Sequence, residues 1–277
     1  MPAGVERLLR GVLKFQQTDK PRLLERLMKL KNNPTLKPKA LMLSCMDSRV
    51  FPREITSSPI GTLFILRNAG NMMPAAQTYQ SCTGHGPAFS SETHACPETA
   101  ALEFVCVRTG VKEVIICGHS DCRAVSALHE MYLDSKNFRS YSSLDLYLRK
   151  YGWPSIEKFK LFKEQPDRPI RFIKQIPNAA FDALLGQEKE SSGEMMKDVD
   201  ILSQLNVLQQ LENVTTHHML KEELHSGLIR LHAMFFDTRT GDALIFSKRH
   251  RKFVTITTES VDGLITEIQQ DSAAQKQ

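Results

Sequence analysis

Apolar residues recur every three or four positions in residues 1–31, which is the spacing of an amphipathic helix. The apolar stripe consists of Leu8, Leu9, Val12, Leu13, Phe15, Leu23, Leu24, Leu27 and Met28. Pro34 and Pro38 end the pattern, because proline cannot continue a helical hydrogen-bond ladder. We therefore expect residues 1–34 to form an N-terminal helical arm, followed by an α/β domain over residues 35–270.

Three short segments dominated by consecutive apolar residues lie beyond the arm, at residues 40–43, 62–66 and 113–117. Runs of this length that are bounded by Pro, Gly or polar residues are typical of buried strands in a parallel sheet. Helical patterns extend over residues 96–108 and 199–211. The alternation of strands and helices predicts an α/β fold with a mainly parallel central sheet flanked by helices.

The sequence pattern in the C-terminal part of the chain predicts a hairpin that extends this sheet. Residues 228–236 and 243–246 are its strands, and the sequence Asp-Thr-Arg-Thr-Gly-Asp at residues 237–242 supplies the turn. Residues 134–170 are polar and interrupted by prolines, and predict an insertion on the surface. Residues 186–197 predict a loop, and a frayed tail is expected from residue 271 onward.

The composition of the 277 residues is that of an ordinary globular protein, with 41% hydrophobic and 24% charged residues. No apolar run approaches the ~20 residues that a membrane-spanning helix needs. The net charge of +5 is modest, and the one dense basic cluster, residues 248–252, is more typical of a solvated strand end than of a phosphate site. We therefore expect neither a membrane span nor a nucleic-acid partner.

Six cysteines occur in a chain whose first residues show no secretory signal. This usage favours a reducing compartment, either the cytoplasm or the mitochondrial matrix, with the thiols free or used as metal ligands. Two interpretations of the basic N-terminal helix remain open. Arg7, Arg10 and Lys14 suit a mitochondrial transit peptide, whereas Glu6 and the scarcity of serine favour a helical arm of the mature protein.

Two polar segments directly follow two of the predicted strands. They are Cys-Met-Asp-Ser-Arg at residues 45–49 and His-Ser-Asp-Cys at residues 119–122. Ligands collect at the carboxyl ends of the strands in an open parallel sheet, so chemistry is expected at both segments. Two thiolates and one imidazole suit tetrahedral Zn²⁺, and three protein ligands leave one position for water. If the first segment is extended, Cys45, Asp47 and Arg49 share one face, and Asp47 can pair with Arg49 beside the metal.

At these residues the sequence resembles the β-class carbonic anhydrases of the animal type, whose signature is Cys-x-Asp-x-Arg followed by a strand and His-x-x-Cys. The resemblance continues through Phe-Ile-Leu-Arg-Asn-Ala-Gly-Asn at residues 64–71. It implies the reversible hydration of carbon dioxide to bicarbonate and a proton, with one zinc ion per subunit. It also implies a homodimer or a higher even oligomer, in which the N-terminal arm embraces the partner.

The resemblance also implies a role for each residue of the two segments. The zinc ligands that it implies are Cys45, His119 and Cys122. The catalytic dyad is Asp47 with Arg49, which orients zinc-bound hydroxide toward carbon dioxide. These five residues form the predicted catalytic centre.

The carbon dioxide pocket that the resemblance implies is lined by Phe64, Ala69 and Phe104. The chain departs from the family pattern near this pocket. Arg123-Ala124 replaces the usual glycine pair after the second cysteine, and Leu36 stands where plant-type members often have a glutamine. An expanded stretch, residues 72–91, separates the second strand from the next helix.

Alternatives to parts of this interpretation remain open. A second, structural zinc site could use Cys82, His85, His94 and Cys96, although the spacing favours a loop with reduced thiols. A closed, non-catalytic zinc site would need a fourth protein ligand, for which Asp47 is the near candidate. A relative acting on carbon disulfide or another small heterocumulene is a third alternative. Asp121 is expected to start a helix and not to bind metal.

Overall fold

The computed structural model describes residues 4–33, 35–76, 96–173, 175–176, 179–186 and 196–274. Six strands form one sheet in the order β2-β1-β3-β6-β7-β8. They are β1 (Ala40–Cys45), β2 (Leu63–Asn68), β3 (Glu113–His119), β6 (Arg230–Phe236), β7 (Ala243–Ser247) and β8 (Lys252–Thr255). The first four strands of this order are parallel, whereas β7 and β8 are antiparallel to their neighbours. The predicted mainly parallel sheet with a C-terminal hairpin is therefore confirmed, and β8 is a further strand at its edge.

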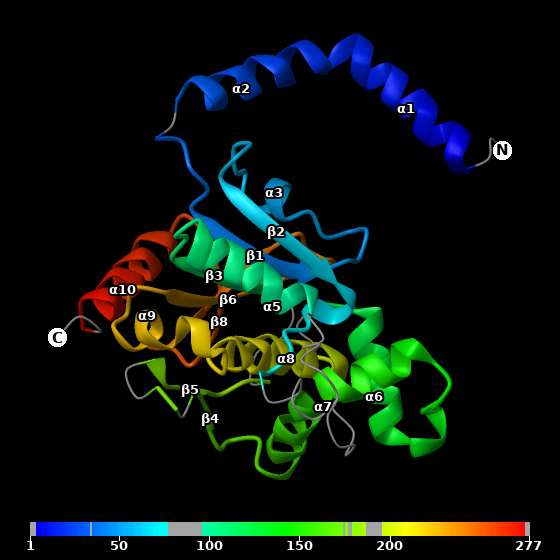
Figure 1. The fold of residues 1–277 in the computed structure, drawn as a ribbon. Helices are drawn as coiled ribbons and strands as arrows, with labels where there is room; N and C mark the ends of the chain where they lie inside the picture. Colours follow the sequence, from blue (N-terminus) through cyan, green and yellow to red (C-terminus); the bar gives the residue numbers. More distant parts are fainter. Residues whose placement is uncertain are drawn as a thin grey trace, which may run out of the picture.

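Helices flank this sheet, as expected for an α/β protein (Figure 1). They are α3 (Pro52–Ile55), α5 (Pro97–Leu102), α6 (Arg123–Leu133), α7 (Ser143–Glu164), α8 (Asp198–Val214), α9 (Lys221–His225) and α10 (Val261–Ala274). The two N-terminal helices are α1 (Gly4–Thr18) and α2 (Lys20–Asn32). A π-helical segment, η2 (Glu103–Arg108), continues α5, and the 3₁₀ turns are η1 (Ala69–Asn71), η3 (Ser135–Asn137) and η5 (His218–Leu220). A separate small hairpin pairs β4 (Ile170–Phe172) with β5 (Phe181–Ala183).

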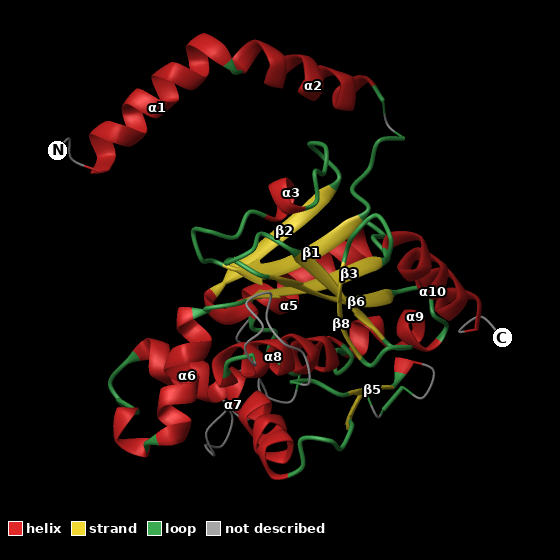
Figure 2. Cartoon of the chain, turned by 180° about the vertical axis from the view of Figure 1, so that it is seen from behind, coloured by secondary structure: helices red, strands yellow, loops and turns green. Residues whose placement is uncertain are grey.

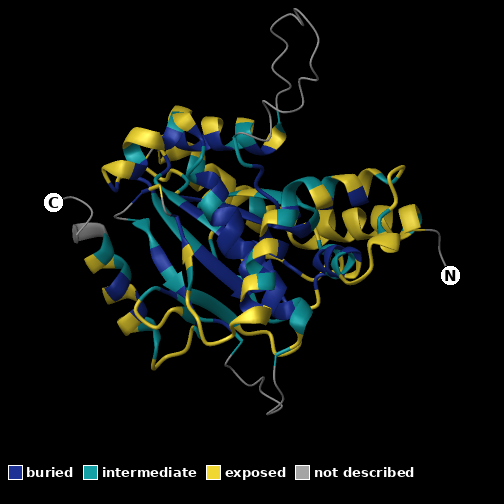
Figure 3. Cartoon of the chain, turned by 90° about the horizontal axis from the view of Figure 1, so that it is seen from below, coloured by how far each residue is buried: buried dark blue, intermediate teal, exposed yellow. Residues whose placement is uncertain are grey.

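The central helix of the molecule is α8. It lies along β3 and β6, and α6 and α7 pack against its other side (Figure 2). Most of α8 is therefore buried and is drawn dark blue in the middle of Figure 3. Its buried amides bond to the loop after β2, because Asn206 Nδ2 donates to the Gly70 carbonyl at 2.9 Å and Asn213 Nδ2 to the Met73 carbonyl at 2.7 Å. These bonds fix the loop beside the carboxyl ends of the strands.

The apolar runs of β1 and β3 are largely buried on both faces of the sheet. The run of β2 is only partly buried, because β2 is an edge strand and its Ile65 is 43% exposed, so the prediction of a buried strand at residues 62–66 is wrong in this respect. Leu41 and Leu43 of β1 belong to the large core that includes α8. Met42 lies between them and joins Cys117 and Met234 in a smaller cluster. Because successive side chains of a strand point to opposite faces, this smaller cluster lies on the other side of the sheet. Continuous apolar runs are required where a strand is covered on both faces.

The prediction of a surface insertion at residues 134–170 is wrong. Most of this segment is α7, which packs between α6, α8 and β4. Its buried residues, among them Leu148, Ile156 and Phe159, recur every three or four positions and join the main core. Lysines and glutamates between these positions, together with Pro154 inside the helix, concealed the helical period in the sequence.

Helices α1 and α2 stand apart from the sheet and have no buried residue (Figures 1 and 2). The predicted helical pattern of residues 1–31 is thus confirmed, while the division of the chain into arm and domain stays a prediction. At the other end, α10 continues through Ala274, so residue 271 lies in a helix and not in a frayed tail. The basic cluster at residues 248–252 forms the turn between β7 and β8, where Lys248 Nζ lies 2.9 Å from Asp271 Oδ2.

In the described part of the chain, no helix combines the length and the apolar character that crossing a bilayer requires. Two sequence-based expectations lie largely outside the described residues. Only the ends of the loop at residues 186–197 are described. Of the alternative zinc cluster, only Cys96 is described, and its thiol lies 2.7 Å from Glu98 Oε2.

Candidate functional site

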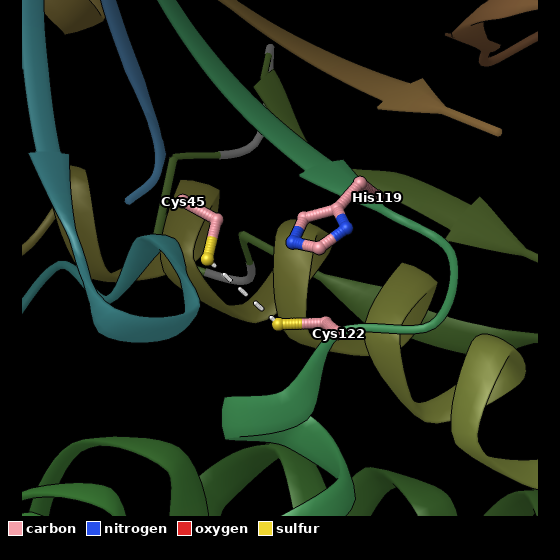
Figure 4. A group of neighbouring side chains, drawn as sticks. All are labelled: Cys45, His119 and Cys122. Carbon is pink, nitrogen blue, oxygen red and sulfur yellow. Dashed lines mark hydrogen bonds between the residues drawn. The ribbon is translucent and has the colours of Figure 1, made fainter. Parts of the chain in front are cut away.

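The three predicted metal ligands lie together at the carboxyl ends of two neighbouring strands. Cys45 is the last residue of β1 and His119 the last of β3, and these strands are parallel and adjacent. Cys122 directly precedes α6. The three side chains are buried, and their ligand atoms lie within 4.8 Å of one another (Figure 4). The two sulfur atoms are 3.9 Å apart.

Two glycines allow the backbone to adopt the geometry of this site. A Cβ atom at Gly118 would lie 2.3 Å from Val207 Cγ2, so only glycine permits α8 to pack this closely beside His119. Gly70 has a φ of 73°, which disfavours other residues, and its N–H points at the Cys45 sulfur at 3.4 Å. Backbone N–H donors of this kind stabilise a thiolate.

The His119 ring is oriented by a backbone carbonyl. Nδ1 lies 2.8 Å from the Ser120 carbonyl oxygen. Because a carbonyl only accepts, Nδ1 carries the hydrogen, and Nε2 has a free lone pair. Nε2 is buried without a hydrogen-bond partner, and Figure 4 shows the ring directed toward the two sulfurs. An imidazole held in this tautomer, with its other nitrogen buried and unpaired, is suited to bind a metal ion.

The pKa of each thiol of the site depends on its contact with the other. The hydrogen bond from Cys122 outweighs burial and lowers the pKa of the Cys45 thiol to about 4. The same contact, together with burial, raises the pKa of Cys122. One thiolate is therefore stabilised beside one thiol, and a divalent cation binding here would displace the remaining proton. Two sulfurs and one nitrogen at these separations fit a tetrahedral zinc site that keeps a fourth position.

The predicted Asp47–Arg49 pair is present in the loop that follows β1. Arg49 Nε donates to Asp47 Oδ1 at 3.0 Å and Nη2 to Oδ2 at 2.8 Å, which is a bidentate contact. The Arg49 side chain thereby holds the pKa of Asp47 far below its usual range. The Asp47 carboxylate is ionised and is oriented by Arg49, two residues after the predicted ligand Cys45.

Sequence reasoning missed Arg67, which holds the backbone of this loop. Its Nε donates to the Cys45 carbonyl at 3.0 Å and its Nη2 to the Asp47 carbonyl at 2.7 Å. Arg67 lies near the carboxyl end of β2, opposite Ser44 of β1. Its position at the carboxyl end of a parallel strand next to β1 is the signal from which this role of Arg67 could have been predicted.

Asp121 does not start a helix as expected. α6 begins at Arg123, and Asp121 adopts a left-handed conformation with a φ of 54°. Its carboxylate contacts Arg49 instead, with Nη1 donating to Oδ2 at 2.7 Å. Asp121 lies outside the cluster of three residues, and the expectation that it does not bind metal stays a prediction.

A cavity of about 430 Å³ opens beside these residues. Its lining includes Cys45, Asp47, Arg49 and Ala69, together with Arg123 and Ala124. Phe64 and Phe104 do not line this cavity but contact each other edge to face, with ring centroids 5.9 Å apart. Of the three predicted pocket residues, the structure therefore brings only Ala69 to the cavity, and the substrate contacts of all three stay predictions.

Comparisons with known proteins identify the family of the chain. The family model described as carbonic anhydrase matches residues 40–152 and 155–243. The chain is 37% identical to beta carbonic anhydrase 1 of Caenorhabditis elegans, over 95% of this chain and 93% of the relative. It is 27% identical to a carbonic anhydrase of Pseudomonas aeruginosa, over 90% of each.

Among solved structures, the β-carbonic anhydrase CcaA aligns over 92% of each chain with a TM-score of 0.66 and 23% identity, which shows the same fold. The family match spans the four parallel strands of the sheet and the candidate site together, and the C. elegans relative extends the similarity over nearly the whole chain. The chain therefore belongs to the β class of the carbonic anhydrase family.

Proposed function

We propose that this enzyme catalyses the zinc-dependent, reversible hydration of carbon dioxide to bicarbonate and a proton. The observation that carries this proposal is the buried group of Cys45, His119 and Cys122, in which His119 Nε2 has no hydrogen-bond partner. This donor set fits one zinc ion per subunit. Membership in the carbonic anhydrase family supports the substrate, carbon dioxide.

Zinc bound at this site supplies a Lewis acid that makes water nucleophilic near neutral pH. Cys45, His119 and Cys122 would hold the ion, and the Ser120 carbonyl keeps the His119 ring in the required orientation. The Asp47 carboxylate accepts a hydrogen from the attacking nucleophile and orients it toward carbon dioxide. Arg49 keeps that carboxylate ionised and in place through its bidentate contact.

The position of Asp47 favours this proposal over a closed, structural zinc site. A closed site needs four protein ligands, and Asp47 is the near candidate for the fourth. Both of its carboxylate oxygens accept hydrogen bonds from Arg49, and Asp47 is not part of the ligand cluster. This supports a fourth position open to water.

We expect the purified protein to contain one zinc per chain. Because the buried Nε2 and thiolates lose their partner when zinc leaves, chelation should lower the melting temperature and abolish hydration. At free zinc ~1,000 times its dissociation constant, the expected stabilisation is about 4 kcal/mol. Metal analysis with thermal unfolding, before chelation and after zinc is restored, measures both effects. Unchanged unfolding and activity after complete zinc removal would contradict the proposed site.

We also propose that the active form is a homodimer or a higher even oligomer. The apolar stripe of the arm is exposed, with Leu8 70% exposed, and no residue of α1 or α2 is buried. A groove of about 1,180 Å³ lies between α2 and β2 and includes Leu30, Phe51 and Ile65 in its lining. An exposed apolar surface of this kind usually marks an interface.

Deleting residues 1–31 should therefore convert the oligomer into a monomer in light scattering. A sharper pair of variants changes one residue inside the apolar stripe of α1 and one outside it. Leu9→Glu places a charge in the apolar stripe and should dissociate the oligomer, whereas Arg10→Gln changes the exposed pair with Glu6 and should not. An unchanged, fully active oligomer after the deletion would count against this role.

Localisation in the cytoplasm or the mitochondrial matrix stays a prediction.

A further inference from the structure

Both residues between the second and third ligands are held by groups that are distant in the sequence. Ser120 Oγ donates to Asp237 Oδ1 at 2.8 Å, and the backbone N–H of Asp121 donates to Asp200 Oδ1 at 2.8 Å. Asp237 directly follows β6, and Asp200 lies in the first turn of α8. The loop that carries two of the three ligands is therefore anchored to two separate elements.

The Asp200 carboxylate is itself fixed. It is 2% exposed, and Arg239 Nη1 donates to its Oδ2 at 3.0 Å. Arg239 Nε also donates to Asp237 Oδ1 at 3.2 Å, so one arginine of the hairpin turn joins both anchors. A buried carboxylate that has a guanidinium on one oxygen and a backbone N–H on the other has little freedom to move.

This anchoring fixes Asp121 in its left-handed conformation and presents two of its oxygens to Arg49. Arg49 Nη1 donates to Asp121 Oδ2 at 2.7 Å, and Nη2 donates to the Asp121 carbonyl at 3.0 Å. The same guanidinium contacts Asp47 through Nε and Nη2. Arg49 is thus held between two carboxylates, and the one on Asp121 is part of an anchored loop.

We infer that Asp121 is a positioning residue for hydration, which fixes the Arg49 guanidinium and, through it, the Asp47 carboxylate. The Arg49 side chain is 43% exposed. An exposed arginine held by one carboxylate is weakly restrained, because water and side-chain entropy compete with the pair. The second carboxylate removes this freedom. The inference rests on the proposed function, because it assumes that the orientation of Asp47 matters for hydration.

The test compares Asp121→Asn with a matched control in the zinc-loaded enzyme. Asparagine tolerates the left-handed conformation and keeps the backbone N–H to Asp200, so zinc should stay at one per chain. Asp182→Asn removes an equivalent carboxylate from an exposed arginine elsewhere, Arg171, at 3.2 Å. We expect Asp121→Asn to lower kcat about 10-fold and to change KM by less than about 2-fold. Replacing a group that orients a metal ligand typically costs ~10–100-fold in activity, and the expected loss lies at the low end of that range. Asp182→Asn should leave both unchanged.

Two further measurements separate a positioning role from a general structural one. In an Arg49→Ala background, Asp121→Asn should change kcat by less than about 2-fold. If Asp121 acts only through Arg49, its substitution has no further effect once the Arg49 side chain is gone, so the two effects are not additive. In a crystal structure of the zinc-loaded Asp121→Asn enzyme, the Arg49 guanidinium should no longer occupy one ordered position in contact with Asp47, while the three metal ligands stay in place.

Three results would overturn the inference: a kcat equal to that of the control, losses that multiply in the double variant, or an unchanged Arg49–Asp47 contact in the crystal structure. A zinc-loaded wild-type protein without hydration activity would contradict the proposed function instead. In that case the position of Arg49 in the variant crystal structure would still decide whether Asp121 holds it.

Discussion

A Cys45→Ser variant is expected to lose its zinc and its carbon dioxide hydration together. The change removes one of three protein ligands and replaces a thiolate with a hydroxyl, which is a poor zinc ligand at neutral pH. Because Cys122 and His119 Nε2 are buried and directed at the same point, the two remaining ligands cannot compensate. Metal content by mass spectrometry and hydration by stopped flow should both fall to the background of the assay. His119→Gln and Cys122→Ser should behave in the same way.

Cys96→Ser is the matched control for these variants. Cys96 also carries a thiol, but this thiol lies just before α5 beside Glu98 and outside the ligand cluster. This variant should keep stoichiometric zinc and full activity. A Cys45→Ser protein that behaved like Cys96→Ser would contradict the assignment of the ligands.

Asp47→Asn should retain its zinc, unlike the ligand variants, while its hydration is slowed by 10-fold or more. The substitution keeps the size of the side chain but replaces one carboxylate oxygen with an NH₂ group. That group cannot accept a hydrogen bond from the nucleophile or from Arg49, and groups that orient metal-bound reactants are worth ~10–100-fold. Because Asp47 is outside the ligand cluster, the zinc stoichiometry should not change.

The measurement for Asp47→Asn is kcat for hydration on protein of known zinc content, with Asp182→Asn as the control for loss of a carboxylate from an arginine pair. Loss of zinc from Asp47→Asn would show that Asp47 is a ligand, and would favour the closed site. Full activity with bound zinc would show that the Asp47–Arg49 pair has no catalytic role.

The location of the site could be predicted because it depends on local patterns. Continuous apolar runs predict buried parallel strands, and the residues directly after two such strands must lie at one edge of the sheet. Cys45 and His119 satisfy this rule, and β1 and β3 are indeed neighbours. The Asp47–Arg49 contact is present, but the extended segment on which it was predicted is not, because residues 47–50 form a turn in which the Val50 N–H donates to the Asp47 carbonyl at 3.0 Å.

The contacts that hold the site could not be predicted, because they join residues far apart in the chain. Asp121 bonds to Arg49 across 72 positions, and Ser120 bonds to Asp237 across 117. No periodicity carries information about such pairs. The sequence predicts a helix start at Asp121, because aspartate is common there, but the left-handed conformation and the tertiary contacts decide its role. In α7 the tertiary packing likewise prevails over a polar, proline-containing sequence.

The central claim is that this chain hydrates carbon dioxide with zinc held by Cys45, His119 and Cys122. Stopped-flow hydration by wild-type protein of measured zinc content tests it most directly, with a pH indicator reporting the released proton. We expect a hydration rate that rises in proportion to bound zinc, reaches its maximum at one zinc per chain, and is absent from the zinc-free protein. A fully zinc-loaded protein that does not accelerate hydration above the buffer rate would contradict the account.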